Sequence, residues 1–216
     1  MKDRLAAVHA RIAEAAKAAG RDAASVRLVA VSKTKPAAMI REAYEAGQRD
    51  FGENYAQELA SKAAELADLV DLRWHFIGHL QSNKAKLVAP VARLVHSVDS
   101  TSLAIELAKR SPKPLPVLVE VNAGEAQKHG VTEAGVAALL DAIDAQPNLE
   151  LRGLMTVPPT DAAETRRAFE RLAKLRERLG PDRLPELSMG MSADLDVAIA
   201  CGATLVRIGT ALFGAR

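Results

Sequence analysis

Two lysines follow an apolar segment near the start of the chain and could do chemistry there. The stretch LVAVSKTKP (28–36) is an apolar run followed by Lys33 and Lys35, with Pro36 at its end. If the backbone stays extended to Pro36, both lysine side chains lie on one face of the strand. A neighbouring cation and a dry environment disfavour the ammonium form, and a neutral amine can attack a carbonyl to form a Schiff base. The alternative is that both are solvated charges at a helix entry.

Two small-residue pairs near the C-terminus could seat a phosphate group. Gly190 and Ser192 lie in SMGMSADLD (188–196), and Gly209 and Thr210 lie in RIGTALFG (207–214). Glycine allows close approach, and N–H groups at helix starts bind phosphate oxygens, so we expect Ser192 to be the N-cap of the next helix. Ordinary turns use the same residues. Two such pairs together favour the phosphate interpretation.

Arg207 alternates with apolar residues in the segment LVRIG (205–209). It therefore shares a face with Leu205 and Gly209, and we expect it to point into the interior of the fold. One interpretation is a structural salt bridge. The other is functional: a fixed arginine facing a pyridine nitrogen keeps that nitrogen unprotonated and weakens the ring as an electron sink.

The histidines do not form a metal-site pattern. His75 and His79 are four residues apart, but their segment has the pattern of a strand and turn, without helical spacing or carboxylate companions. His79 could contact a ligand, whereas His9, His96 and His129 are interpreted as surface or core residues. We therefore predict no metal site.

Short β-branched segments alternate with longer helical segments along the whole chain, which is typical of parallel strands covered by helices. The predicted strands are 26–32, 49–54, 72–78, 93–99, 115–122, 149–157, 184–190 and 204–210. Eight such units favour an α/β fold of the closed (β/α)₈ TIM-barrel type over an open doubly wound sheet. Residues 161–179 are predicted to form a helix with a capping box at Asp161 and Glu164 and a stop at Gly180.

The first 20 residues have an amphipathic helical pattern, with Leu5, Val8, Ile12 and Ala16 on one face. We expect this helix to pack on the barrel. No linker or composition shift divides residues 1–216, so a single domain is predicted.

Chemically reactive or polar residues follow each predicted strand, as expected where the carboxyl ends of barrel strands form an active site. They are Lys33, Glu53, Asn54, Gly78, His79, Asp99, Asn122, Met155, Thr156, Met191, Ser192, Arg207, Gly209 and Thr210.

The composition excludes several classes of protein. A net charge of +2 from 29 basic and 27 acidic residues gives no sign of nucleic-acid binding. No apolar stretch approaches the ~20 residues that cross a bilayer, so no membrane association is predicted. The single cysteine, Cys201, is interpreted as an inert core thiol in a reducing compartment, which favours a cytoplasmic location.

Seven motifs, in this order, resemble the pyridoxal 5'-phosphate (PLP) homeostasis protein family, which is related to the N-terminal domain of alanine racemase. They are AVSKTKP, FGENYAQE, WHFIGHLQSNK, VHSVDS, VLVEVNAGEAQKHGV, LRGLMTVPP and LSMGMSADLDVAIACGATLVRIGTALFGAR. The resemblance implies a fold type III barrel that carries PLP as an internal aldimine on Lys33.

The resemblance also implies the other contacts of the cofactor. Asn54 would lie beside the ring, and Arg207 would face the pyridine nitrogen. The phosphate would be held by Ser192, Gly209, Thr210 and the backbone near Met191. Two further amines, Lys35 and Lys128, would accept or relay the cofactor.

The implied function is buffering or delivery of PLP, with PLP-dependent apo-enzymes as candidate partners and no assigned reaction. An amino-acid racemase is the first alternative. Two-base racemisation needs a second acid/base, which the larger relatives supply as a tyrosine from a second domain. The chain ends at Arg216 and its tyrosines, Tyr44 and Tyr55, fall in or beside predicted helices. We therefore expect an open site with poor catalysis.

A second alternative is a barrel enzyme that forms a lysine imine with a phosphorylated carbonyl substrate and uses no cofactor. The aromatic content of 3% gives little sign of a large hydrophobic interface, so a monomer is expected.

Overall fold

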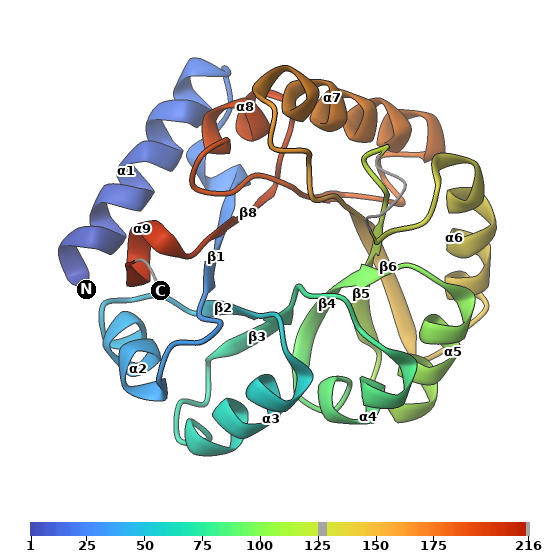
Figure 1. Cartoon of the computed structure of the whole chain (residues 1–216), viewed down its shortest axis with the longest axis horizontal. Coiled ribbons are helices and arrows are strands. Elements are labelled where there is room, and N and C mark those ends of the chain that lie inside the picture. Colours follow the sequence, from blue (N-terminus) through green and yellow to red (C-terminus); the bar gives the residue numbers. More distant parts are fainter. Residues whose placement is uncertain (125–128, 215–216) are drawn as a thin grey trace.

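The computed structural model describes residues 1–124 and 129–214, and its centre is a closed barrel of parallel strands (Figure 1). The strands follow one another around the barrel in chain order. They are β1 (Arg27–Val31), β2 (Asp50–Glu53), β3 (Arg73–Phe76), β4 (Ala92–Val98), β5 (Leu115–Glu120), β6 (Leu149–Met155), β7 (Glu186–Ser188) and β8 (Leu205–Ile208). All eight predicted strands are confirmed: β4 has its predicted length but begins one residue earlier, and the other seven are two to four residues shorter than their sequence patterns.

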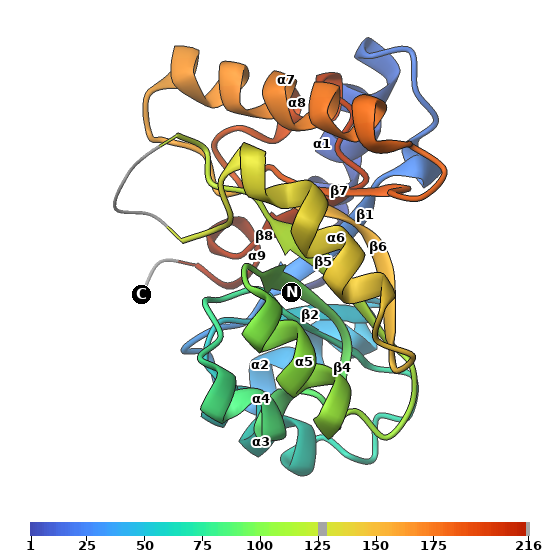
Figure 2. The ribbon, with the colours of Figure 1, turned by 90° about the vertical axis from the view of Figure 1, so that its right-hand side faces the viewer.

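Helices lie between the strands and form the outer layer (Figure 1). The α-helices are α1 (Lys2–Ala18), α2 (Ala37–Glu45), α3 (Ala56–Glu65), α4 (Ala85–Val88), α5 (Thr101–Arg110), α6 (Val136–Asp144), α7 (Ala162–Leu179), α8 (Leu195–Ala200) and α9 (Thr210–Phe213). In the side view, α1, α7 and α8 lie over one side of the barrel and α2 to α5 over the other (Figure 2). The TIM-barrel prediction is confirmed.

Pairing of the first strand with the last closes the sheet. Ala30 of β1 is in register with Phe51 of β2 on one side and with Ile208 of β8 on the other. A closed sheet has no free edge, so every strand pairs through its backbone on both sides.

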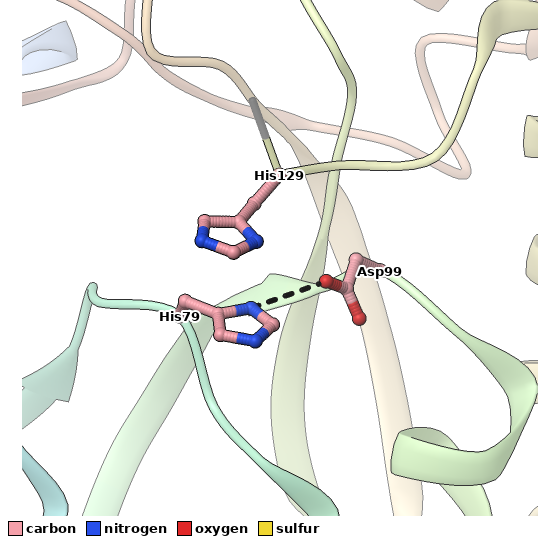
Figure 3. Close-up of side chains that lie close together, drawn as sticks. All are labelled: His79, Asp99 and His129. Atoms are coloured by element: carbon pink, nitrogen blue, oxygen red, sulfur yellow. Dashed lines mark ion pairs between the residues drawn. The ribbon is translucent and has the colours of Figure 1, made fainter. Parts of the chain in front are cut away.

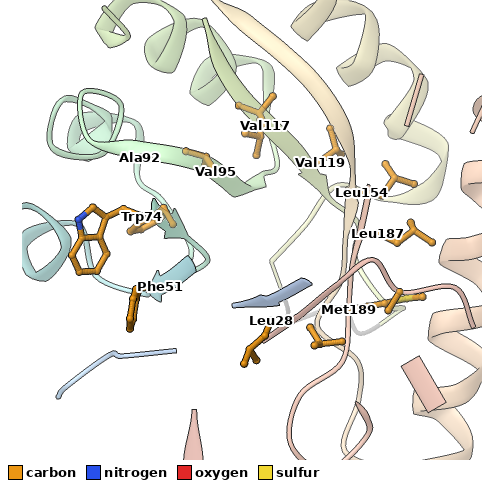
Figure 4. Close-up of a cluster of buried hydrophobic side chains, with 14 of the residues drawn as sticks. Leu28, Phe51, Trp74, Ala92, Val95, Val117, Val119, Leu154, Leu187 and Met189 are labelled. Carbon is orange, nitrogen blue, oxygen red and sulfur yellow. The ribbon is translucent and has the colours of Figure 1, made fainter. Parts of the chain in front are cut away.

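Apolar side chains fill two layers. Those that point outward from the strands pack under the helices, as Figure 4 shows for Leu28, Phe51, Trp74, Val117 and Leu187. The interior of the barrel holds a smaller apolar cluster, whose members are Val29, Leu94, Leu118, Met155 and Leu205. This division follows from the strand period of two, which sends successive side chains to opposite faces.

The two long helices agree with the sequence prediction. Asp161 caps α7 by accepting hydrogen bonds from the N–H groups of Ala163 (3.0 Å) and Glu164 (2.9 Å), and Gly180 ends the helix with φ of +102°. Helix α1 packs against α8 and α9 and buries its predicted apolar face (Figure 1). In the described part of the chain, no helix combines the length and the apolar character that a membrane span requires.

The carboxyl ends of all eight strands lie at one end of the barrel, which we call the mouth. It consists of the residues that follow each strand. Because the strands are parallel, residues far apart in sequence meet there.

Candidate functional site

Lys33 lies in a tight turn at the mouth, directly after β1. The N–H of Lys35 donates to the carbonyl of Ser32 (3.0 Å) and closes the turn, and Thr34 has a φ of +62°. The backbone is therefore not extended to Pro36, and the condition under which Lys33 and Lys35 would share one strand face is not met. The chain turns at Lys33 because the polar groups of Ser32 and Thr34 bond to β2 and α3. Both lysines are partly buried.

Arg207 projects from β8 into the barrel interior, as its alternation with apolar residues predicts. It is 5% exposed. Its Nη1 donates to the carbonyl (2.8 Å) and hydroxyl (2.7 Å) of Ser188, and its Nη2 donates to the carbonyl of Thr156 (3.0 Å). Burial lowers the pKa of Arg207 to about 10, against the opposing charges of Glu120 and Asp194, so it stays cationic at neutral pH. Its hydrogen-bond acceptors are neutral groups, which does not fit the structural salt-bridge interpretation.

A chain of buried hydrogen bonds continues from Arg207 through the barrel. Ser188 Oγ bonds His96 Nδ1 (2.8 Å), His96 Nε2 bonds His75 Nδ1 (2.9 Å), and His75 Nε2 bonds Asp50 (2.8 Å). Burial, followed by the charges of His75 and Arg207, lowers the pKa of His96 well below its usual value. An arginine only donates and a carboxylate only accepts, so Arg207 and Asp50 mark the donor end and the acceptor end of the chain. The chain orients Ser188 and thereby Arg207.

The sequence did not predict this chain. His96 was expected to be a surface or core residue and His75 had no assigned role, because neither residue belongs to a motif with a known spacing. The alternation of His75 with apolar strand residues, and its separation from His96 by one βα unit, were the only available signals.

Ser192 lies in the loop between β7 and α8, but it does not cap the helix. Helix α8 begins at Leu195 with Asp194 at the N-cap position. The carboxylate of Asp194 accepts the N–H of Met191 (2.5 Å), which engages that N–H within the protein. Arg11 of α1 holds the loop by donating to the carbonyl of Ser192 (2.6 Å). The predicted N-cap is wrong because a turn over residues 192–194 separates Ser192 from the helix.

Gly209 and Thr210 begin α9 directly after β8, with Gly209 at the N-cap position. A Cβ on Gly209 would lie 3.2 Å from the carbonyl oxygen of Val31, so this end of β8 abuts the end of β1. The Lys33 turn and Thr210 are therefore neighbours at the mouth. Within the described ranges, the hydroxyls of Ser192 and Thr210 make no hydrogen bond, which leaves both able to bind a ligand.

Asn54 follows β2, and its backbone lies against Gly78, which the sequence analysis identified only as the end of a predicted strand. A Cβ on Gly78 would come within 2.2 Å of the carbonyl oxygen of Asn54, so only glycine permits this approach. The side-chain Oδ1 of Asn54 is buried and has no hydrogen-bond partner among the described residues. A buried acceptor without a partner can accept a hydrogen bond from a ligand, either directly or through a bridging water molecule. Asn54, Tyr55 and His79 line a hollow of about 260 Å³.

Glu120 ends β5 and is a further mouth residue that sequence reasoning missed. It is 7% exposed, and its Oε2 has no hydrogen-bond partner in the described structure. Burial, reinforced by the charge of Asp99 and opposed by that of Arg207, raises the pKa of Glu120 to about 7. Its burial was not predicted from the segment VLVEVN, because a lone carboxyl group in a strand pattern more often faces solvent.

Three loops bring His79, Asp99 and His129 together at the mouth (Figure 3). His79 Nδ1 lies 3.4 Å from Asp99 Oδ2, and the two imidazole rings stack with centroids 3.7 Å apart and planes 7° apart. Parallel rings direct their nitrogen lone pairs in parallel planes rather than at one point, so a shared cation would require one ring to rotate. Lys128, which directly precedes His129 in the sequence, lies outside the described residues.

A hollow of about 520 Å³ opens beside the mouth between the segment after β5 and helix α7. Its lining combines polar and apolar side chains, and the polar ones are Asn122, Thr132, Glu133, Thr156 and Arg171. Lys33 and Arg207 do not line it.

The mouth therefore offers groups that suit a phosphorylated aldehyde such as PLP. Lys33 provides an amine directly after β1. Arg207 projects from β8 as a buried cation whose Nε has no described acceptor. Asn54, directly after β2, has an amide oxygen with no hydrogen-bond partner among the described residues. The hydroxyls of Ser192 and Thr210, which make no hydrogen bond among the described residues, lie after β7 and β8, where this fold commonly holds phosphate.

Comparisons with known proteins agree with this fold. The family model described as the alanine racemase N-terminal domain matches residues 4–216. The pyridoxal phosphate homeostasis protein of Pseudomonas aeruginosa is 55% identical over 220 residues, which cover 99% of this chain and 95% of that protein.

Two solved structures extend the comparison. PipY of Synechococcus elongatus with PLP bound superposes with a TM-score of 0.80 at 43% identity, covering 94% of this chain and 100% of that one. Alanine racemase from Corynebacterium glutamicum has a TM-score of 0.71 at 21% identity, covering 98% of this chain and 62% of that one, and shows the fold alone. The chain therefore belongs to the alanine racemase N-terminal domain family and, within it, to the pyridoxal phosphate homeostasis proteins.

Proposed function

We propose that this protein binds PLP at the mouth of the barrel, attached through the amine of Lys33, and buffers or delivers it in PLP homeostasis. The name of the Pseudomonas aeruginosa relative and the PLP-bound structure of PipY support this proposal.

The observation that carries the proposal is that Arg207 projects into the barrel from β8, the strand that pairs with β1, and that β1 leads directly into the Lys33 turn. Val29 of β1 is in register with Arg207 of β8, so the buried cation and the amine belong to adjacent strands at one end of the barrel. Arg207 is held by three hydrogen bonds to neutral groups, which leaves its charge for a ligand.

Each mouth residue has a distinct role in this proposal. Bound PLP supplies an aldehyde that condenses with amines and a pyridine ring that withdraws electrons. Lys33 provides the amine. Arg207 donates toward the pyridine nitrogen and keeps it unprotonated, which favours retention of the cofactor over electron withdrawal. Asn54 orients the ring, and Ser192, Gly209 and Thr210 bind the phosphate, with the backbone near Met191 at its edge.

We further propose that the chain acts as a single domain and as a monomer in the cytoplasm, with PLP-dependent apo-enzymes as recipients. The low aromatic content supports a monomer, and the single cysteine supports a reducing compartment.

Reduction of the purified protein with borohydride tests the proposal. We expect a yellow protein, a pyridoxyl adduct that mass spectrometry maps to Lys33, and loss of the adduct in Lys33→Ala but not in the control Lys35→Ala. A colourless protein that takes up no added PLP would refute the proposal and favour a cofactor-free lysine enzyme. Turnover of alanine or serine that disappears in Lys33→Ala would instead favour a racemase.

A further inference from the structure

A buried lysine that no motif pointed to lies beneath the Lys33 turn. Lys62 belongs to α3, which packs beside β2 and β3 (Figure 1), and is 6% exposed. Its ammonium donates to the carbonyl of Ser32 (2.7 Å), to Oε1 of Glu53 (2.7 Å) and to Oε1 of Glu58 (2.7 Å). An ammonium has three N–H donors, so the described contacts use all of them.

The two carboxylates that bind Lys62 also bind the Lys33 turn, one on each side of Lys33. Glu53 Oε1 accepts the hydroxyl of Ser32 (2.6 Å), and Glu58 Oε1 accepts the N–H of Thr34 (2.7 Å). Both residues that flank Lys33 are therefore linked to Lys62. Ser32 is linked directly and through Glu53, and Thr34 is linked through Glu58.

The turn needs such support because its backbone is strained. Thr34 has a φ of +62°, a region that β-branched residues rarely adopt. Strained residues persist where surrounding contacts over-determine them, and they concentrate at functional sites. The bond from Thr34 N–H to Glu58 is one such contact.

Stability alone does not account for this cluster. Glu53 is fully buried and its Oε2 has no described partner, while burial raises the pKa of Glu53 despite the bonds from Lys62 and Ser32. A buried ion pair of this kind is often replaceable by apolar side chains without loss of stability. A purely structural role does not explain why the cluster of Lys62, Glu53 and Glu58 binds the residues on both sides of Lys33.

We propose that Lys62 is a positioning residue for Lys33: its ammonium holds the main chain on both sides of Lys33 and so fixes where the attachment amine projects into the mouth. This inference rests on the proposed function, in which Lys33 carries PLP.

The test compares Lys62→Met, which keeps the side-chain length and removes the charge, with the matched control Lys109→Met on the exposed end of α5. Hydrogen exchange at the Thr34 amide is measured on the cofactor-free proteins. The rate of borohydride-fixed adduct formation with added PLP and its distribution between Lys33 and Lys35 are then mapped by mass spectrometry.

In Lys62→Met we expect Thr34 exchange to accelerate and adduct formation at Lys33 to slow, each roughly tenfold or more, as for loss of a charge-assisted hydrogen bond. The share of adduct on Lys35 should rise, which a merely structural residue would not cause. A folded Lys62→Met protein that matches Lys109→Met in all three measurements would overturn the inference.

If Lys62→Met does not fold, Glu58→Ala decides, because Glu58 is partly exposed and its removal frees only the Thr34 side of the turn. It should accelerate Thr34 exchange and slow adduct formation at Lys33, and unchanged values would overturn the inference. Wild-type adduct found mainly on a lysine other than Lys33 would refute the proposed function itself, whereas wild-type adduct mainly on Lys33 with unaffected variants refutes only the role of Lys62.

Discussion

Replacing Glu120 by glutamine should change how the stability of this protein depends on pH. Burial raises the pKa of Glu120 from 4.5 to about 7. Between these two values the folded protein keeps a proton that the unfolded chain releases. The contribution of Glu120 to stability is therefore present below pH 4.5 and is lost as the pH rises toward and past 7.

The magnitude follows from the size of the shift. At 1.36 kcal/mol per pH unit, a shift from 4.5 to about 7 corresponds to about 3 kcal/mol, of which roughly 2.5 kcal/mol falls between pH 5 and pH 8. Glutamine has nearly the same shape and does not titrate, so Glu120→Gln should lack this loss.

Urea unfolding of wild type and Glu120→Gln at pH 5 and pH 8 measures the effect, with Glu14→Gln on the exposed face of α1 as the control. We expect Glu120→Gln to gain about 2.5 kcal/mol relative to wild type on going from pH 5 to pH 8. A difference below about 0.5 kcal/mol, equal to that of the control, would show that Glu120 ionises as it does in the unfolded chain and would refute the argument.

Three further predictions concern stability and can be checked by denaturant unfolding. His96→Ala should lower the free energy of unfolding by about 3 kcal/mol, because it leaves a cavity and unpaired groups on Ser188 and His75, and a loss under about 1 kcal/mol would contradict the buried chain. Thr34→Gly should raise it by about 1 kcal/mol, since glycine adopts a φ of +62° without steric cost; a decrease would mean that the turn is not strained. Asp161→Ala should lower it by about 1 kcal/mol through loss of the α7 cap, and no change would argue that the cap bonds are replaced by water.

The local elements of this protein could be read from its sequence. β-Branched apolar runs separated by amphipathic segments predict eight strands and the helices between them, because the periods of two and 3.6 are properties of consecutive residues. The inward orientation of Arg207 followed from the same alternation, and the cap at Asp161 from side-chain chemistry within a few residues. These predictions held because short-range geometry decides them.

The boundaries of the loops at the mouth could not be predicted in the same way. The strand before Lys33 ends at Val31, and α8 begins after Ser192 rather than at it. In both cases a long-range partner decides the turn: Glu53 and Glu58 bind the residues beside Lys33, and Arg11 of α1 binds the carbonyl of Ser192.

The sequence by itself determined the barrel class, the family and the residues that stand at the strand ends, since motifs and hydrophobic periods are written in the order of residues. The tertiary structure alone decided the partners of those residues: Lys62 beneath the Lys33 turn, the chain from Asp50 to Arg207, and the buried environment of Glu120. The physical reason is that charge, burial and hydrogen bonding depend on distances between side chains of different strands. Closure of the barrel sets those distances, and no local pattern contains them.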